Sequence, residues 1–222
     1  MNKYIAITIS ILLVSWSFAA DLNESKVKEM DLVRCGNLVY AGNQSSVCFA
    51  TKFLSKLKQN TSIKASTRLK DVRLTDPNLY QTPFIIFSGE GNFKVSSDET
   101  NGFADYLKEG GFVLASPSCS DPKWDKAFRN FLKSSLPDIK LEEISMNHPI
   151  FSLVYEVKSL HLSTGGTTKL EGLFVDDRLA LVYSKDGLND IKNAKGCCCC
   201  GGNEIKESQQ MNVNIFTYAL VY

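Results

Sequence analysis

The chain contains a run of four consecutive cysteines, Cys197, Cys198, Cys199 and Cys200, with Gly196 before it and Gly201-Gly202 after it. Thiols form disulfides and thiolates bind soft metal ions, so the run has the residue type for either chemistry. Zinc takes its ligands in a tetrahedron, usually from two pairs separated by a reversal of the chain. Four adjacent residues cannot easily all face one ion, and adjacent cysteines rarely bond to each other. The run is therefore expected to work with cysteines elsewhere.

Cys35 and Cys48 are the expected partners of this run, either in disulfides or as ligands of one metal ion. Zinc or another thiophilic ion such as copper(I) would suit such a site. The chain has seven cysteines, an odd number, so one thiol is left over even if all the others pair. Three roles stay open for the run: a disulfide staple, a metal clip, and free thiols that cycle between oxidation states.

The first 19 residues have the pattern of a signal peptide. Lys3 provides a positive charge, residues 4–14 form an apolar stretch, and small residues precede a cut after Ala19. The apolar stretch is short for a membrane span, so a retained anchor is the alternative reading. An exported protein, periplasmic or extracellular, is expected, with no transmembrane segment once the signal is removed.

Composition limits the class of partner. Residues 20–34 form a polar lead-in and residues 35–222 one domain, because no linker or internal repeat divides them. The chain has 25 basic and 24 acidic residues, and no basic stripe with interleaved aromatic residues is visible. Nucleic acid is therefore not an expected partner. An unknown small molecule or protein is.

Apolar segments bounded by turn residues alternate with segments of helical spacing. The expected strands are residues 37–40, 64–74, 83–87, 112–115 and 140–144. The expected helices open at Ser45-Ser46, at Ser96 with a capping box to Glu99, and at Asp121 with Pro122 as first residue. This alternation predicts an α/β fold, in which a mainly parallel sheet is covered by helices on both faces.

The last third of the chain does not continue the alternation of strands and helices. Residues 172–175 and 179–183 predict two strands joined in a hairpin that is added to the edge of the sheet. Residues 211–222 are largely apolar and predict a closing helix or strand that docks on the core.

Two loops leave buried strands at the edge where parallel sheets bind ligands. The first contains Ser88, Gly89, Glu90, Gly91 and Asn92, whose glycines would let a ligand approach the backbone. It lacks the lysine and hydroxyl of a phosphate-binding loop. The alternative is that the two glycines only form a tight turn.

The second loop places Cys119 before a helix N-terminus, where the helix dipole favours a thiolate. A nucleophilic cysteine needs a base, and the chain has only His148 and His161. His148 is the expected catalytic partner, with Glu90 as another candidate. The competing interpretation of His148 is a loop residue hydrogen-bonded to backbone.

Several segments resemble one family, the DUF4159 domain. They are residues 76–80, 83–93, 107–112, 147–151 and 212–220, which agree with its motifs in order over nearly the whole chain from Cys35. The family is bacterial, often exported or membrane-associated, and its activity is uncharacterised. It is similar to the class I glutamine-amidotransferase-like group, which implies a flavodoxin-like three-layer sandwich.

The resemblance does not carry over the amidotransferase site. Cys119 lacks the flanking glycines of the catalytic elbow, and Ile150 stands where the His-Pro-Glu motif has its glutamate. The leading hypothesis is therefore an exported domain that binds a small molecule or protein partner, with the cysteine run as a staple or metal clip. The alternatives are a hydrolase that uses Cys119 and a thiol-based metal or redox protein.

Overall fold

The computed structural model describes residues 32–45, 48–193 and 204–222. Residues 33–222 form one compact unit, which begins two residues before the predicted boundary at Cys35. The predicted signal peptide, most of the lead-in and the run from Cys197 to Cys200 lie outside the described residues.

Seven strands form one mixed sheet in the order β2-β1-β3-β4-β9-β8-β5. The first five are parallel neighbours, β8 pairs antiparallel with β9, and β5 pairs antiparallel with β8. The α/β prediction is confirmed, and so is the hairpin, because β8 and β9 extend the sheet beyond β4. The strand bounds are β1 Val33–Leu38, β2 Ala65–Val72, β3 Phe84–Gly89, β4 Phe112–Pro117, β5 Glu142–Glu143, β8 Glu171–Val175 and β9 Arg178–Tyr183.

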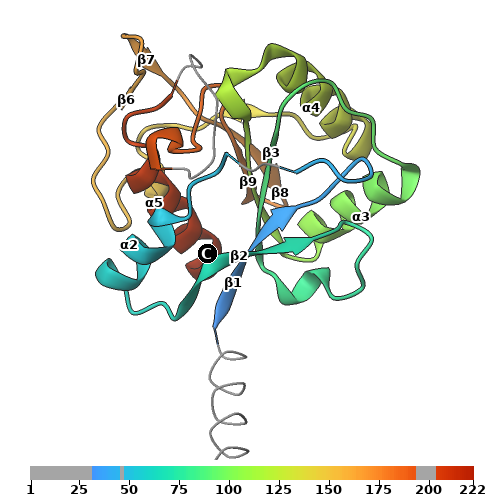
Figure 1. Ribbon diagram of the computed structural model, residues 1–222, viewed down its shortest axis with the longest axis horizontal. Coiled ribbons are helices and arrows are strands. Elements are labelled where there is room, and N and C mark those ends of the chain that lie inside the picture. The colour runs from blue at the N-terminus through green and yellow to red at the C-terminus, as the bar shows by residue number, and fades with distance from the viewer. Residues whose placement is uncertain (1–31, 46–47, 194–203) are drawn as a thin grey trace, which may run out of the picture. The chain divides into compact units, whose positions relative to one another are not determined.

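Four described α-helices cover the sheet, two on each face (Figure 1). Helices α2 (Lys52–Asn60) and α5 (Ser208–Val221) pack on one face, and α3 (Ser97–Lys108) and α4 (Pro122–Ser135) on the other. The chain turns to one side from β1 to β2 and to the other from β3 to β4, and right-handed crossovers then place the helices on opposite faces. Short 3₁₀ turns span Leu79–Gln81, Ser118–Ser120, Pro149–Phe151 and Ile191–Asn193.

The predicted helix ends on the α3 and α4 face are confirmed. Ser96 accepts from the Glu99 amide while the Glu99 carboxylate accepts from Ser96, which completes the capping box. The second oxygen of Glu99 accepts from the Ala41 amide, 2.8 Å away, so this cap also holds the loop after β1. Asp121 caps α4 by accepting from Lys123.

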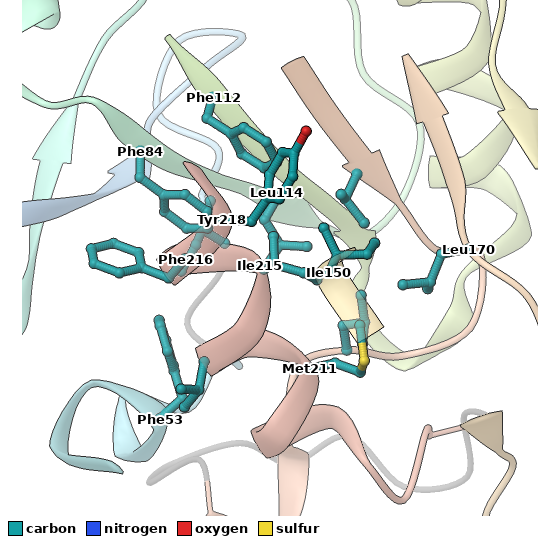
Figure 2. Close-up of a cluster of buried hydrophobic side chains, with 14 of the residues drawn as sticks. Phe53, Phe84, Phe112, Leu114, Ile150, Leu170, Met211, Ile215, Phe216 and Tyr218 are labelled. Carbon is teal, nitrogen blue, oxygen red and sulfur yellow. The ribbon is translucent and has the colours of Figure 1, made fainter. Parts of the chain in front are cut away.

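Helix α5 is buried on nearly every side and carries no charged residue (Figure 2). Ile215, Phe216 and Tyr218 point toward the sheet, where Phe216 meets Phe84 edge to face at 4.7 Å. At 14 residues it is short for a bilayer, and none of the helices that the structure describes is both long and apolar enough to span one.

Two elements depart from the expectation. Helix α2 starts at Lys52 and not at Ser45, and residues 46–47 lie outside the described residues. Just before the helix, Ala50 donates its amide to the Asn189 carbonyl. A small hairpin of β6 (Leu160–His161) and β7 (Thr167–Thr168) was not predicted. Two residues per strand are too few to show a periodic pattern.

Gly89 is required by the close approach of Tyr40 and not by a turn. A Cβ at position 89 would lie 2.0 Å from the Tyr40 Oη and 3.0 Å from the Trp124 Nε1. That hydroxyl accepts from Trp124 at 2.8 Å and donates to the Ser88 carbonyl. Tyr40 therefore joins the ends of β1 and β3 to α4.

We expect Gly89→Ala to lower the free energy of unfolding by about 1–3 kcal/mol, because the methyl group overpacks a rigid hydroxyl. Urea denaturation measures the change. In a Tyr40→Phe background the same substitution should cost less, since the clashing oxygen is gone. Equal costs in the two backgrounds would contradict this explanation of Gly89.

Candidate functional site

The carboxyl ends of β3, β4 and β9 meet in a cluster of buried hydroxyl and amide groups. The Ser88 Oγ accepts from the Asn189 Nδ2 at 3.0 Å and lies 3.5 Å from the Ser118 Oγ. Ser88 and Asn189 are fully buried. The three residues come from three different segments, so the cluster exists only in the folded chain.

A second hydroxyl holds the segment after β9 in place. The Ser116 Oγ donates to the Asp186 carbonyl at 3.3 Å and accepts from the Leu188 amide at 3.2 Å. Asn212 on α5 donates to the Leu188 carbonyl at 2.8 Å. Residues 186–189 are therefore bound from both sides, and this fixes the direction of the Asn189 side chain.

Two buried polar atoms at this edge have no hydrogen-bond partner among the described residues. They are the Asn189 Oδ1 and the Ser184 Oγ. A buried acceptor left unsatisfied costs about 1–3 kcal/mol, so such atoms are rare in folded proteins unless water or a ligand meets them. These two oxygens can therefore accept hydrogen bonds that the described residues do not provide.

The predicted ligand loop is only partly available. Ser88 and Gly89 are buried, whereas Glu90 and Asn92 are exposed. Gly91 adopts a φ of 73° and donates its amide to Asp121. Asn92 lines a cavity of about 220 Å³ between α3 and α4, beside Phe93, Thr100 and Asn130. Of the five residues, Glu90 and Asn92 can meet a ligand directly.

Cys119 occupies a sharp turn between β4 and α4. Its φ is 54° and that of Ser120 is 52°, a left-handed conformation that non-glycine residues rarely adopt. Both residues are partly exposed. The turn presents the Cys119 side chain at the edge of the sheet, in front of the N-terminus of α4.

The structure does not bring His148 to Cys119. The His148 Nδ1 accepts from the Ile150 amide at 3.3 Å, and its ring packs 5.1 Å from that of Tyr218. Tyr218 in turn contacts Phe112, the first residue of β4, whereas Cys119 follows the last. His148 therefore lies near the amino end of β4 and Cys119 beyond its carboxyl end. Burial lowers the pKa of His148, as for a packed loop residue.

The three described cysteines differ in state, because Cys35 is free whereas Cys48 and Cys119 each take part in an interaction. Cys35 is a fully buried free thiol inside β1, and burial raises its pKa well above the ordinary value. That position does not suit the predicted staple or metal ligand. Cys48 is also buried, two residues before the Ala50 amide that binds Asn189, at the same edge as Cys119. Within the described residues no group of three histidine, cysteine or acidic side chains is placed to hold a metal.

A polar cleft of about 530 Å³ lies between α4 and the β8–β9 hairpin, but its charges are already used. Arg129 makes a bidentate ion pair with Glu171, at 3.1 and 2.6 Å, and a second with Asp125. Lys169 pairs with Glu143 at 2.6 Å. The Arg129–Glu171 pair joins α4 to β8, and the Lys169–Glu143 pair joins the segment before β8 to β5, so both have a structural role.

Sequence reasoning missed a serine, a histidine and a glutamate that lie together. The His161 Nδ1 lies 2.9 Å from the Glu207 Oε1, and the Ser159 Oγ lies 2.9 Å from the His161 Nε2. The serine oxygen is also 3.4 Å from Nδ1, so it sits beside the ring and not on the axis of the Nε2 lone pair. A general base needs that axis, so the arrangement is not a catalytic triad.

The Glu207 contacts instead fasten the β6–β7 hairpin to the start of α5. Burial alone would raise the pKa of Glu207, but hydrogen bonds from the His161 backbone and ring lower it overall. No periodic pattern marks this contact, since the two residues are 46 positions apart.

We expect Glu207→Gln to reduce stability relative to the unchanged chain above pH 4.5, the ordinary glutamate value. A lowered pKa means that the ionised group stabilises the fold there, and the benefit is lost as pH falls through the folded-state pKa. Urea denaturation across a pH series measures the difference. A constant difference down to the most acidic point would contradict the assignment.

The strand order of the five parallel strands, with helices on both faces, is that of a flavodoxin-like α/β domain. Within that class the chain belongs to the family described as Domain of unknown function (DUF4159), whose model matches residues 37–220. No curated protein matches the chain.

Proposed function

We propose that this protein is an exported binding domain, periplasmic or extracellular, that holds a small polar molecule at the carboxyl ends of β3, β4 and β9. The observation that carries the proposal is the buried Asn189 Oδ1, which has no partner among the described residues although its amide nitrogen is fixed on Ser88. An unused acceptor in a rigid position favours a ligand that presents an N–H or O–H donor.

The exposed groups around this cluster support the same choice. Glu90 and Asn92 provide an exposed carboxylate and an exposed amide after β3, and Cys119 and Ser120 form the partly exposed turn after β4. Both groups can form hydrogen bonds, although the cavity that Asn92 lines also contains Phe93 and Phe131. They suit a hydroxylated or amine-bearing ligand better than an apolar one.

A thermal-shift screen of the full chain against sugars, amino acids and polyamines tests this function. We expect a stabilising compound whose effect falls at least several-fold in the Glu90→Ala/Asn92→Ala variant, because both side chains are exposed and contribute little to folding. Glu109→Ala/Asn60→Ala, which removes the same two exposed groups at the opposite edge, is the matched control. Equal loss of binding in both double variants would refute the site.

The described residues on either side of the cysteine run lie near this edge. Asn193, just before the segment, bonds to Asp190 and Lys52, and Glu204, just after it, pairs with Gly187. Since Cys35 is buried and free, Cys48 and Cys119 are the better partners for disulfides with Cys197 to Cys200. In this role the run is a staple over the ligand edge; a metal clip that uses the same cysteines is the alternative.

Intact-mass analysis of the natively purified chain separates these possibilities and the competing cysteine hydrolase. The staple predicts a loss of two hydrogens for each bond, and tryptic peptides that link Cys48 and Cys119 to the run. A native mass with a bound metal ion and unoxidised thiols would favour the clip. Alkylation of Cys119 without prior reduction would contradict its part in the staple and favour the nucleophile.

A further inference from the structure

The near-neutral total charge conceals a strong separation of charge. Residues 51–73 contain seven basic residues and one acidic residue, while the rest of the chain carries more acidic than basic residues. The exclusion of nucleic acid from the sequence used the total charge and the lack of a basic stripe with interleaved aromatic residues. We call these seven residues the basic face: Lys52, Lys56, Lys58, Lys64, Arg68, Lys70 and Arg73.

The fold gathers the basic face onto two adjacent elements. Three of the residues lie on α2, three on or just beyond β2, and Lys64 immediately before β2, where it is exposed. Helix α2 packs beside β2 and α5, and α5 contributes no charge of either sign. Lys56 and Lys70 are partly buried and the other five are exposed.

Few acidic side chains lie near these charges in the described residues, although Asp71 and Asp76 line a cavity with Arg73. None of the seven takes part in an ion pair there. Lys52 and Arg73 donate to neutral oxygens, of Asn193, Gly42 and Asn43. Asp71, the one carboxylate in the segment, accepts from Asn37 instead. A positive surface of this size raises the local concentration of anions.

Protection of a sheet edge explains only part of the basic face. Charged residues on an edge strand prevent pairing with other chains, and β2 is such a strand. Its register with β1 also shifts between Val33 and Cys35, an irregularity that already discourages pairing. The three lysines of α2 lie on a helix and protect no edge.

The point where the N-terminal segment joins the domain lies at this face. Val33, the first residue of β1, donates its amide to the Lys64 carbonyl at 2.8 Å. The residues before it include the apolar stretch 4–14, which keeps this end of the domain at a membrane if the stretch is retained as an anchor. We propose that the basic face is a docking surface for an anionic phospholipid membrane, which holds the domain with α2 and β2 toward the headgroups.

Vesicle sedimentation of the full chain tests the proposal. The probes are vesicles of phosphatidylcholine alone and of phosphatidylcholine with phosphatidylglycerol in equal amounts. The ratio of the two partition coefficients removes any contribution of the apolar N-terminal stretch. We expect Lys56→Gln/Lys58→Gln/Lys64→Gln/Arg68→Gln to lower this ratio by about a hundredfold, since each basic residue near an anionic surface strengthens binding several-fold. Added salt should lower the wild-type ratio as well.

The matched control is Lys94→Gln/Lys126→Gln/Lys133→Gln/Lys140→Gln, which removes four exposed lysines from the α3 and α4 side. It should leave the ratio within about twofold of wild type, because at physiological salt these charges lie beyond roughly one Debye length, about 8 Å, from the bilayer. Equal losses in both variants would overturn the proposal, and so would a wild-type ratio near one. Binding of the wild type to heparin but not to the anionic vesicles would also overturn it and assign the face to a soluble polyanion.

Discussion

The burial of helix α5 is the constraint on which the rest of this structure depends. Two asparagines, Asn212 and Asn214, are fully buried in it, and a buried amide is tolerated only when it is hydrogen-bonded. Asn214 accepts from the amides of Val154 and Tyr155 and donates to the Tyr155 carbonyl. Asn212 holds Leu188. Helix α5 thus holds two loops that precede it in the sequence.

This constraint reaches the candidate site through one residue. Leu188 precedes Asn189, so the bond from Asn212 helps to set the amide that holds the Ser88 hydroxyl. The buried cluster is therefore built from the core outward. The exposed residues at the same ends of the strands, Glu90 and Asn92, do not help to hold the buried cluster together. Such a division allows ligand preference to change at the surface without loss of the fold.

The sheet and the starts of α3 and α4 could be predicted because they depend on local patterns, such as the buried run at β3 and the capping box of Ser96 with Glu99. The site could be predicted only in part. The loops after β3 and β4 were found, but the role of Gly89 depends on Tyr40, 49 positions away, and that of Ser88 on Asn189. His148 was paired with Cys119 because each suits catalysis by type, and sequence carries no sign of which edge of a sheet a residue will reach. The basic face was missed because the total charge does not show where the charged residues lie in the fold.

The buried thiol of Cys35 has a practical consequence. It lies in β1, next to the edge strand β2, with none of its surface exposed, and burial keeps it in the unreactive protonated form. Alkylation at this position must await an opening of the sheet, whereas a cysteine at the surface would react at once. The rate at which Cys35 is alkylated, measured from the mass of its peptide, thus reports how often the native sheet opens. No label or engineered probe is needed to read it.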